Sequence, residues 1–232
     1  MQKTVLVEML VEDISSNFLK RFASRMLPTW NESASRSMTD DLVHPALKRY
    51  CFGQDRYHLI QSMFLKVGEE SGYESKVVLC DMNNYPIPEV VIGRFAFSAN
   101  YTFNPTEKYV LNSSQTRKQH SAINNQYMRR GQGNLFGDTF DETKILIAEK
   151  IQANILFGCG GNGLDYENNG FLRIAFPSVE AKKDKNGNDT NKVYFVENHK
   201  YSDILQLVSD KERNAQAKPK IADIAVPKLK IK

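Results

Sequence analysis

Residues 108–137 combine positive charge with aromatic and amide side chains, and they contain no aspartate or glutamate. Their five lysine and arginine residues give a local charge of +5, whereas the whole chain carries +4. Lysine and arginine neutralise phosphates, aromatic rings stack on bases, and amides hydrogen-bond to base edges. We therefore predict that this segment binds nucleic acid, either RNA or DNA. The candidate contacts are Arg117, Lys118, His120, Tyr127, Arg129, Arg130 and Phe136.

A second group of residues has the spacing of a metal-dependent nuclease site. Asp165 is followed by Glu180 and Lys182, which resembles the PD-(D/E)xK pattern. In such a site two carboxylates hold Mg²⁺, and the lysine polarises the attacking water or steadies the phosphate. Pro177 lies three residues before Glu180, where this pattern requires a strand. We therefore expect these residues not to form an active site, and we keep the nuclease as the alternative function.

A glycine cluster at Gly158, Gly160 and Gly163 matches the spacing GxGxxG. The dinucleotide-binding form of this motif needs a strand before it and a helix after it, so that the helix N-terminus faces the pyrophosphate. Here we expect a helix before the cluster and a strand after it. This order favours a helix end followed by a turn, and we expect no cofactor.

The expected order of helix, glycine loop and strand, with Gly170 and Phe171 at the loop end, is similar to another family. It resembles the glycine-rich loop of the repeat-associated RNA-binding proteins of CRISPR effector complexes. The resemblance covers about 20 residues, with extra residues between the glycines and without the basic residues usual inside the loop. It implies a fold that is ferredoxin-like in part, and guide RNA as a ligand.

The elements that carry these segments are predicted from hydrophobic periodicity and turn-forming residues. In the first half we expect a strand at 3–11 and then a helix from Asp13 or Ser15 to about Leu27, which Pro28 ends. A polar connector at 29–41 follows, and then a helical region that Gly53 splits, with its second part at 54–67. Strands at 75–81 and 89–103 complete this half. In the second half we expect a helix from Asp138 or Thr139 to about Phe157, strands at 171–176 and 192–197, and a helix at about 201–209.

This order predicts an α+β fold with an antiparallel sheet built from hairpins with flanking helices. Residues 95–103 place an aromatic or small side chain at every second position, so we expect their aromatic face to be buried. We expect one domain at 1–210, with the long basic loop at 108–137, and a basic tail at 211–232.

Composition narrows the class of protein. The 232 residues are 41% hydrophobic and 25% charged, as in an ordinary globular protein. No run approaches the roughly 20 apolar residues of a membrane span, so we expect no membrane partner. The three cysteines form no C-x-x-C pair, which argues against a zinc ribbon and favours a cytoplasmic protein.

The prediction for function is a non-catalytic nucleic-acid-binding subunit with protein partners in a larger assembly. Its support is the charge asymmetry between the 108–137 segment and the rest of the chain. A structural or scaffolding subunit, in which this segment orders against a protein partner, stays open beside the nuclease.

Overall fold

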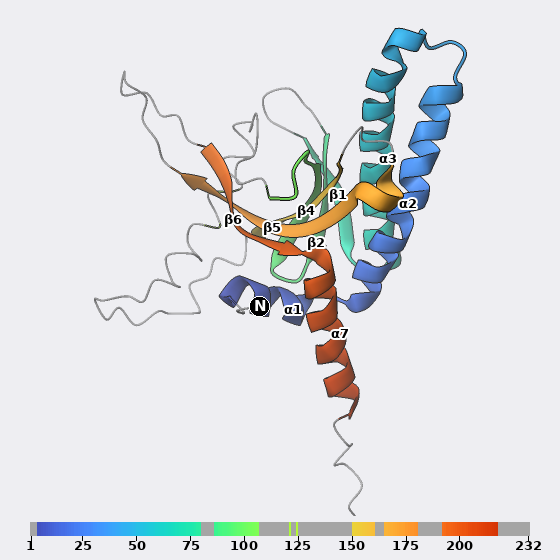
Figure 1. The fold of residues 1–232 in the computed structure, drawn as a ribbon. Helices are drawn as coiled ribbons and strands as arrows, with labels where there is room; N and C mark the ends of the chain where they lie inside the picture. Colours follow the sequence, from blue (N-terminus) through green and yellow to red (C-terminus); the bar gives the residue numbers. More distant parts are fainter. Residues whose placement is uncertain are drawn as a thin grey trace, which may run out of the picture.

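The computed structural model describes residues 4–79, 86–106, 121, 124, 150–160, 165–180 and 192–217. These residues form helices and one six-stranded sheet, so the predicted α+β fold is confirmed. Two long helices stand beside the sheet, and two further helices lie at its lower end (Figure 1).

The strands follow one another across the sheet in the order in which they occur in the chain. They are β1 (Glu74–Leu79), β2 (Pro86–Ile92), β3 (Phe95–Tyr101), β4 (Ile151–Cys159), β5 (Gly170–Glu180) and β6 (Lys192–Lys200). Four of these neighbouring pairs are antiparallel, as predicted, but β3 and β4 are parallel. This order differs from the β-α-β-β-α-β arrangement of ferredoxin-like folds.

A parallel pair needs a crossover connection, because the chain must return to the end of the sheet from which the first strand began. Here the crossover comprises residues 102–150 and contains the entire 108–137 segment. The segment with the unusual charge is therefore part of the crossover that the parallel pairing of β3 and β4 requires.

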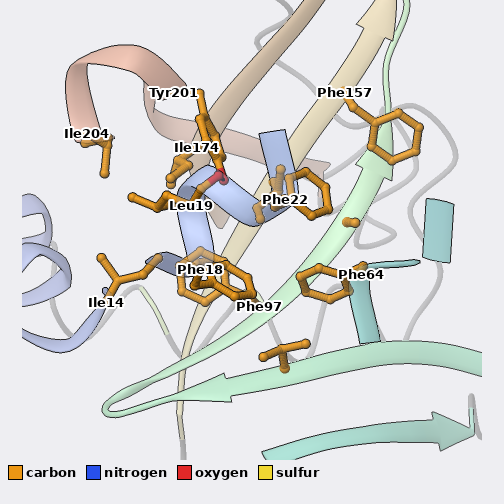
Figure 2. Packing of buried hydrophobic residues seen from close by; sticks show 14 of the residues in the cluster. Ile14, Phe18, Leu19, Phe22, Phe64, Phe97, Phe157, Ile174, Tyr201 and Ile204 are labelled. Carbon is orange, nitrogen blue, oxygen red and sulfur yellow. Dashed lines mark hydrogen bonds between the residues drawn. The ribbon is translucent and has the colours of Figure 1, made fainter. Parts of the chain in front are cut away.

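The helices are α1 (Val5–Asp13), α2 (Ser16–Thr39), the short 3₁₀ helix η1 (Pro45–Leu47), α3 (Lys48–Glu70), α6 (Tyr166–Asn169) and α7 (Tyr201–Ala217). Helices α2 and α3 pack against the sheet through aromatic side chains (Figure 2). The Phe64 ring meets those of Phe18 and Phe22 edge to face, with centroids 6.4 and 5.9 Å apart. Such pairs contribute about 0.5–1.5 kcal/mol beyond their burial.

The predicted strand at 3–11 is wrong, since these residues belong to α1. The Thr4 hydroxyl accepts a hydrogen bond from the Val7 N–H (3.4 Å) and caps the helix. Leu6, Val7 and Leu10 are buried on one face of α1. Burial of this face outweighs the strand preference of the β-branched residues.

The prediction that Pro28 ends the second helix is also wrong. Helix α2 continues through this exposed proline to Thr39, so the predicted connector at 29–41 is largely helical. Trp30, Ser33 and Ser37 beyond it are buried, and α2 packs along α3 over its length. This contact compensates for the hydrogen bond that the proline cannot donate. Helix α3 likewise runs through Gly53 without a break.

The prediction that a helix reaches Phe157 is wrong, because strand β4 begins at Ile151. Ile151 and Ile155 are buried as expected, but nearly all residues of β4 are buried on both faces. A continuous buried run has no period that distinguishes helix from strand. Residues 138–149 of this prediction lie outside the described residues.

The hairpin predictions are confirmed for β1 with β2 and for β5 with β6. The strand predicted at 89–103 is two strands, β2 and β3, separated at Gly93 and Arg94. Phe95 and Phe97 are fully buried as predicted, whereas Phe103 is 75% exposed. The helix predicted at 201–209 is α7, which extends to Ala217, and residues 218–232 of the predicted tail lie outside the described part.

Candidate ligand site at the ends of strands β3 and β4

The seven residues predicted to bind nucleic acid, from Arg117 to Phe136, lie outside the described residues. They are Arg117, Lys118, His120, Tyr127, Arg129, Arg130 and Phe136. Two other residues of the same segment, Ser121 and Asn124, are described and are buried in the protein. Of these two residues, Asn124 contacts the sheet directly.

The side chain of Asn124 lies between strands β4 and β5. Its Nδ2 donates hydrogen bonds to the carbonyl oxygens of Gln152 (2.8 Å) and Pro177 (2.7 Å). Its Oδ1 accepts a hydrogen bond from the Gln152 N–H (2.8 Å). Asn124 is fully buried, so these bonds replace the water that its amide loses.

Pro177 gives a reason for this arrangement. The register of β4 and β5 pairs Asn154 with Ala175, and its continuation would place Gln152 opposite Pro177. Proline has no N–H, so it cannot donate to the carbonyl of Gln152 as another residue would. The Asn124 amide supplies this missing donor and also bonds the remaining groups of the pair. The basic segment is thereby attached to the middle of the sheet.

Three polar side chains form a connected group on strands β3 and β4. Ser98 Oγ and Asn100 Nδ2 both donate to Asn154 Oδ1, at 2.6 and 2.7 Å. Because side chains alternate along a strand, Ser98 and Asn100 face away from the buried Phe97 and Ala99. We call this side of the sheet, marked by Ser98, Asn100 and Asn154, the polar face.

A second cluster surrounds the guanidinium of Arg56, on α3. The Arg56 Cζ atom lies 4.5 Å from the ring centre of Trp30 on α2 and 4.9 Å from that of Phe52 on α3. It lies 4.3 Å from the ring centre of Tyr101, at the end of β3. Each cation–π contact contributes about 0.5–2 kcal/mol and fixes the plane of the guanidinium. We call these four residues the Arg56 cluster.

The described residues provide no carboxylate that pairs with Arg56. Asp55, its neighbour on α3, instead accepts a hydrogen bond from the Ser37 hydroxyl (2.5 Å). Burial lowers the pKa of Arg56, while the nearby Tyr101, which also makes a side-chain hydrogen bond to Arg56, and Cys159 oppose this shift. The guanidinium stays protonated at neutral pH. A partly desolvated positive charge thus lies at the carboxyl ends of the parallel strands β3 and β4.

Trp30 also contacts Tyr166, the first residue of α6. Its ring packs on that of Tyr166, with centroids 4.6 Å apart. The Trp30 Nε1 is buried and has no hydrogen-bond partner in the described part of the chain. Cys159 donates to the Asp165 carbonyl (3.2 Å), and burial raises the pKa of its thiol. This cysteine is therefore a packed thiol and not an activated nucleophile.

The glycine cluster has a different context from the one predicted. Strand β4, not a helix, precedes Gly160, while Gly163 lies outside the described residues. The helix that follows, α6, has four residues, and β5 returns antiparallel to β4. A dinucleotide site needs a longer helix and a parallel second strand, so the motif does not form one here. A Cβ at Gly158 would overlap the Thr102 carbonyl and the Phe171 ring, which explains the glycine there.

Two residues of the nuclease alternative, Asp165 and Glu180, lie far apart along strand β5. Asp165 caps α6 by accepting a hydrogen bond from the Asn168 N–H (3.2 Å). Glu180 is the last residue of β5, whose length of roughly 30 Å separates it from the Asp165 end. Lys182 and the Glu180 side chain lie outside the described residues. No group of three His, Cys, Asp or Glu residues suited to a metal occurs in the described ranges.

No protein-family model, curated protein or solved structure matches the chain. No helix within the described residues has both the length and the apolar character needed to cross a lipid bilayer.

The sequence reasoning missed the Arg56 cluster. Tyr101 and Phe103 belonged to the recognised aromatic alternation, and Phe52 and Arg56 are one helical turn apart. Trp30, however, lies in the predicted polar connector at 29–41 and not in a predicted helix. Without α2 in place, no pattern joined Trp30 to Arg56.

Proposed function

We propose that the protein is a non-catalytic nucleic-acid-binding subunit that contacts RNA or DNA through the 108–137 segment. The observation that carries this proposal is the contact of Asn124 with β4 and β5. Through Asn124, a segment free of carboxylates contacts the sheet. In the sequence, Asn124 lies between Arg117 and Lys118 on one side and Arg129 and Arg130 on the other. A polyanion binds best where basic residues are concentrated and acids are absent.

The exposed ring of Phe103 supports the same proposal. Phe103 lies just after β3, where the crossover begins, and is 75% exposed. Its ring meets that of Tyr101 edge to face, with centroids 5.0 Å apart. An exposed aromatic ring that shortly precedes a basic segment in the sequence provides a face on which an unpaired base can stack.

A binding titration against fluorescently labelled single-stranded RNA and DNA at several salt concentrations tests this function. Replacement of Arg117, Lys118, Arg129 and Arg130 by alanine should weaken binding and flatten the log–log salt slope by up to about three units, since single strands lose about 0.7 per neutralised phosphate. A control variant with the same change in charge replaces four exposed basic residues outside the segment, Lys20, Arg36, Lys66 and Lys200. It should keep most of the wild-type slope.

Equal affinities and slopes for the wild type and the segment variant would reject the segment as the contact. Absence of binding by the wild type at low salt, to both RNA and DNA, would reject the nucleic-acid function. In that case a scaffolding subunit, with the segment ordered against a protein partner, becomes the leading function.

A further inference from the structure

We infer that Arg56 binds a phosphate group of a nucleotide, and that the base of this nucleotide stacks on Phe103. The choice of a nucleotide as the ligand rests on the proposed function. The site itself rests on the geometry of the Arg56 cluster.

The Arg56 guanidinium is held in place by the aromatic side chains around it. The centres of three aromatic rings lie 4.3–4.9 Å from its Cζ atom. Tyr101 also makes a side-chain hydrogen bond to the guanidinium, which leaves other N–H groups of its planar fork for a phosphate that accepts two of them side by side. Arg56 is only partly buried, so this fork is not sealed within the core.

The cluster has two features that a purely structural arginine would not require. The Arg56 charge has no carboxylate partner among the described residues, although burial penalises an uncompensated charge. The adjacent Trp30 Nε1 is buried without a hydrogen-bond acceptor in that part of the chain. An anion at this place would compensate the first group and could accept a bond from the second.

The position of Phe103 suits a base next to that phosphate. Tyr101 contacts both the Arg56 guanidinium and the Phe103 ring. Its ring centre lies 4.3 Å from the Arg56 Cζ and 5.0 Å from the Phe103 centroid. Tyr101 and Phe103 are two residues apart, so both project from the same side of the chain as it leaves β3. The Arg56 Cζ and the Phe103 ring therefore contact the same Tyr101 ring, and the phosphate and the base at the two ends of one nucleotide can reach both.

Trp30 provides a direct probe, because it is the only tryptophan of the chain and touches the Arg56 guanidinium. We expect a saturable change in its emission when the full chain is titrated with uridine 5′-monophosphate or inorganic phosphate at low salt. Uridine, which lacks the phosphate, should give a much smaller change. The variant Arg56→Gln should weaken both phosphate ligands about tenfold to a hundredfold, as expected for the loss of two charge-assisted hydrogen bonds.

Two further variants separate the roles within the site. Arg56→Lys keeps the charge but loses the planar fork, so it should bind more weakly than the wild type. Phe103→Ser should weaken the nucleotide by roughly tenfold, because one base stack is lost, and leave inorganic phosphate unaffected. Arg36→Gln, on the exposed side of α2, is the matched control and should behave as the wild type.

Constant Trp30 emission with millimolar nucleotide and phosphate would overturn the inference, as would wild-type binding by Arg56→Gln. A lower unfolding temperature of Arg56→Gln, combined with a silent Trp30 in the wild type, would assign Arg56 a structural role only. If oligonucleotides bind through the 108–137 segment while Trp30 stays silent, the proposed function stands and this inference fails. If Trp30 responds to the nucleotide while oligonucleotides do not bind, the phosphate site stands and the proposed function fails.

Discussion

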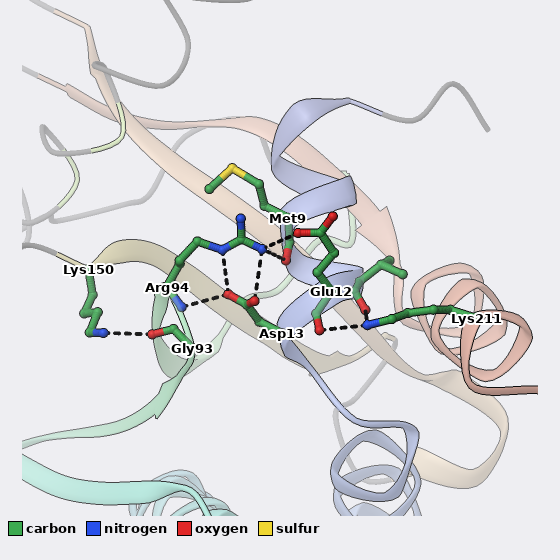
Figure 3. A network of polar contacts seen from close by, with 8 residues as sticks. Met9, Glu12, Asp13, Gly93, Arg94, Lys150 and Lys211 are labelled. Carbon is green, nitrogen blue, oxygen red and sulfur yellow. Dashed lines mark hydrogen bonds and ion pairs between the residues drawn. The ribbon is translucent and has the colours of Figure 1, made fainter. Parts of the chain in front are cut away.

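The carboxylate of Asp13 accepts three hydrogen bonds from Arg94, one from its backbone N–H (2.8 Å) and two from its guanidinium, through Nε (2.9 Å) and Nη2 (3.0 Å) (Figure 3). Asp13 ends α1, and Arg94 lies in the turn between β2 and β3. The same turn is held by Lys150, which donates to the Gly93 carbonyl (2.8 Å). These contacts fix α1 and β4 to one end of the β2–β3 hairpin.

The Asp13–Arg94 contact should contribute measurably to stability. Asp13→Asn removes the charge and should lower the free energy of unfolding by about 1–2 kcal/mol, a value reduced for the partial exposure of Arg94. Urea unfolding at neutral pH measures this change. The control is Glu12→Gln, which removes a more exposed ion pair to the same arginine and should cost less than about 0.5 kcal/mol. Equal losses for the two variants would contradict the assignment.

Glu212 links α7 to the start of α2, and this link should depend on pH. Its carboxylate accepts hydrogen bonds from the Ser16 hydroxyl and from the Ser16 N–H (2.8 Å), and both lower the pKa of Glu212. A folded pKa below the unfolded value of about 4.3 stabilises the protein above that value, and this stabilisation is lost as the pH falls through the folded pKa.

Urea unfolding from neutral pH to pH 3 measures this dependence for the wild type and Glu212→Gln. The wild type should be more stable by a margin that is widest near neutral pH and narrows on acidification. Ser16→Ala removes the hydroxyl donor but keeps the N–H donor, so its margin should be intermediate. A margin that stays constant over this range would exclude the link.

The Asn124 amide should be coupled energetically to Pro177. Asn124→Ala leaves buried groups of Gln152 and Pro177 without partners and should cost about 2–4 kcal/mol. Pro177→Ala restores an N–H opposite the Gln152 carbonyl. We therefore expect the double variant to be more stable than the sum of the single losses by about 1 kcal/mol. Strict additivity in a double-mutant cycle would show that Asn124 does not replace the missing donor.

The two glycines at the end of β4 should respond differently to alanine. A Cβ at Gly158 overlaps the Thr102 carbonyl and the Phe171 ring, so Gly158→Ala should lower stability by about 1–3 kcal/mol. At Gly160 the nearest atoms belong to Asn169 at 3.8 Å, so Gly160→Ala should change stability by less than about 0.5 kcal/mol. Thermal unfolding compares the two, and a similar shift in both would refute the close approach at Gly158.

Local patterns predicted the elements whose burial has a clear period. The β1–β2 hairpin and the buried faces of Phe95 and Phe97 follow from alternation and turn residues. The patterns failed where packing between distant residues decides the structure. Helix α2 passes Pro28 because it packs on α3, and β4 is buried on both faces because it is central in the sheet. Neither cause is visible in a short window of sequence.

The candidate site divides in the same way. The charge of the 108–137 segment is a property of consecutive residues, so composition alone could find it. The Arg56 cluster joins α2, α3 and β3, and no spacing in the sequence encodes that meeting. In the sequence, Asn124 is one amide residue of a long loop and Pro177 is a residue that disfavours a strand. Only the register of β4 and β5 shows that the Asn124 amide replaces the N–H donor that Pro177 lacks.

The parallel pairing of β3 with β4 has a consequence for how the chain folds. The other strand pairs are joined by connections of 11 residues or fewer, whereas this one follows the long crossover and brings Phe95 beside Ile151. Strands β1–β3 with α2 and α3, and β4–β6 with α7, can each form from short-range contacts before that long loop closes. Native-state hydrogen exchange should therefore resolve two cooperative units that divide between β3 and β4. During synthesis the amino-terminal unit would await the strand that completes it, with β3 as a temporary open edge until all of β4, to Cys159, has left the ribosome.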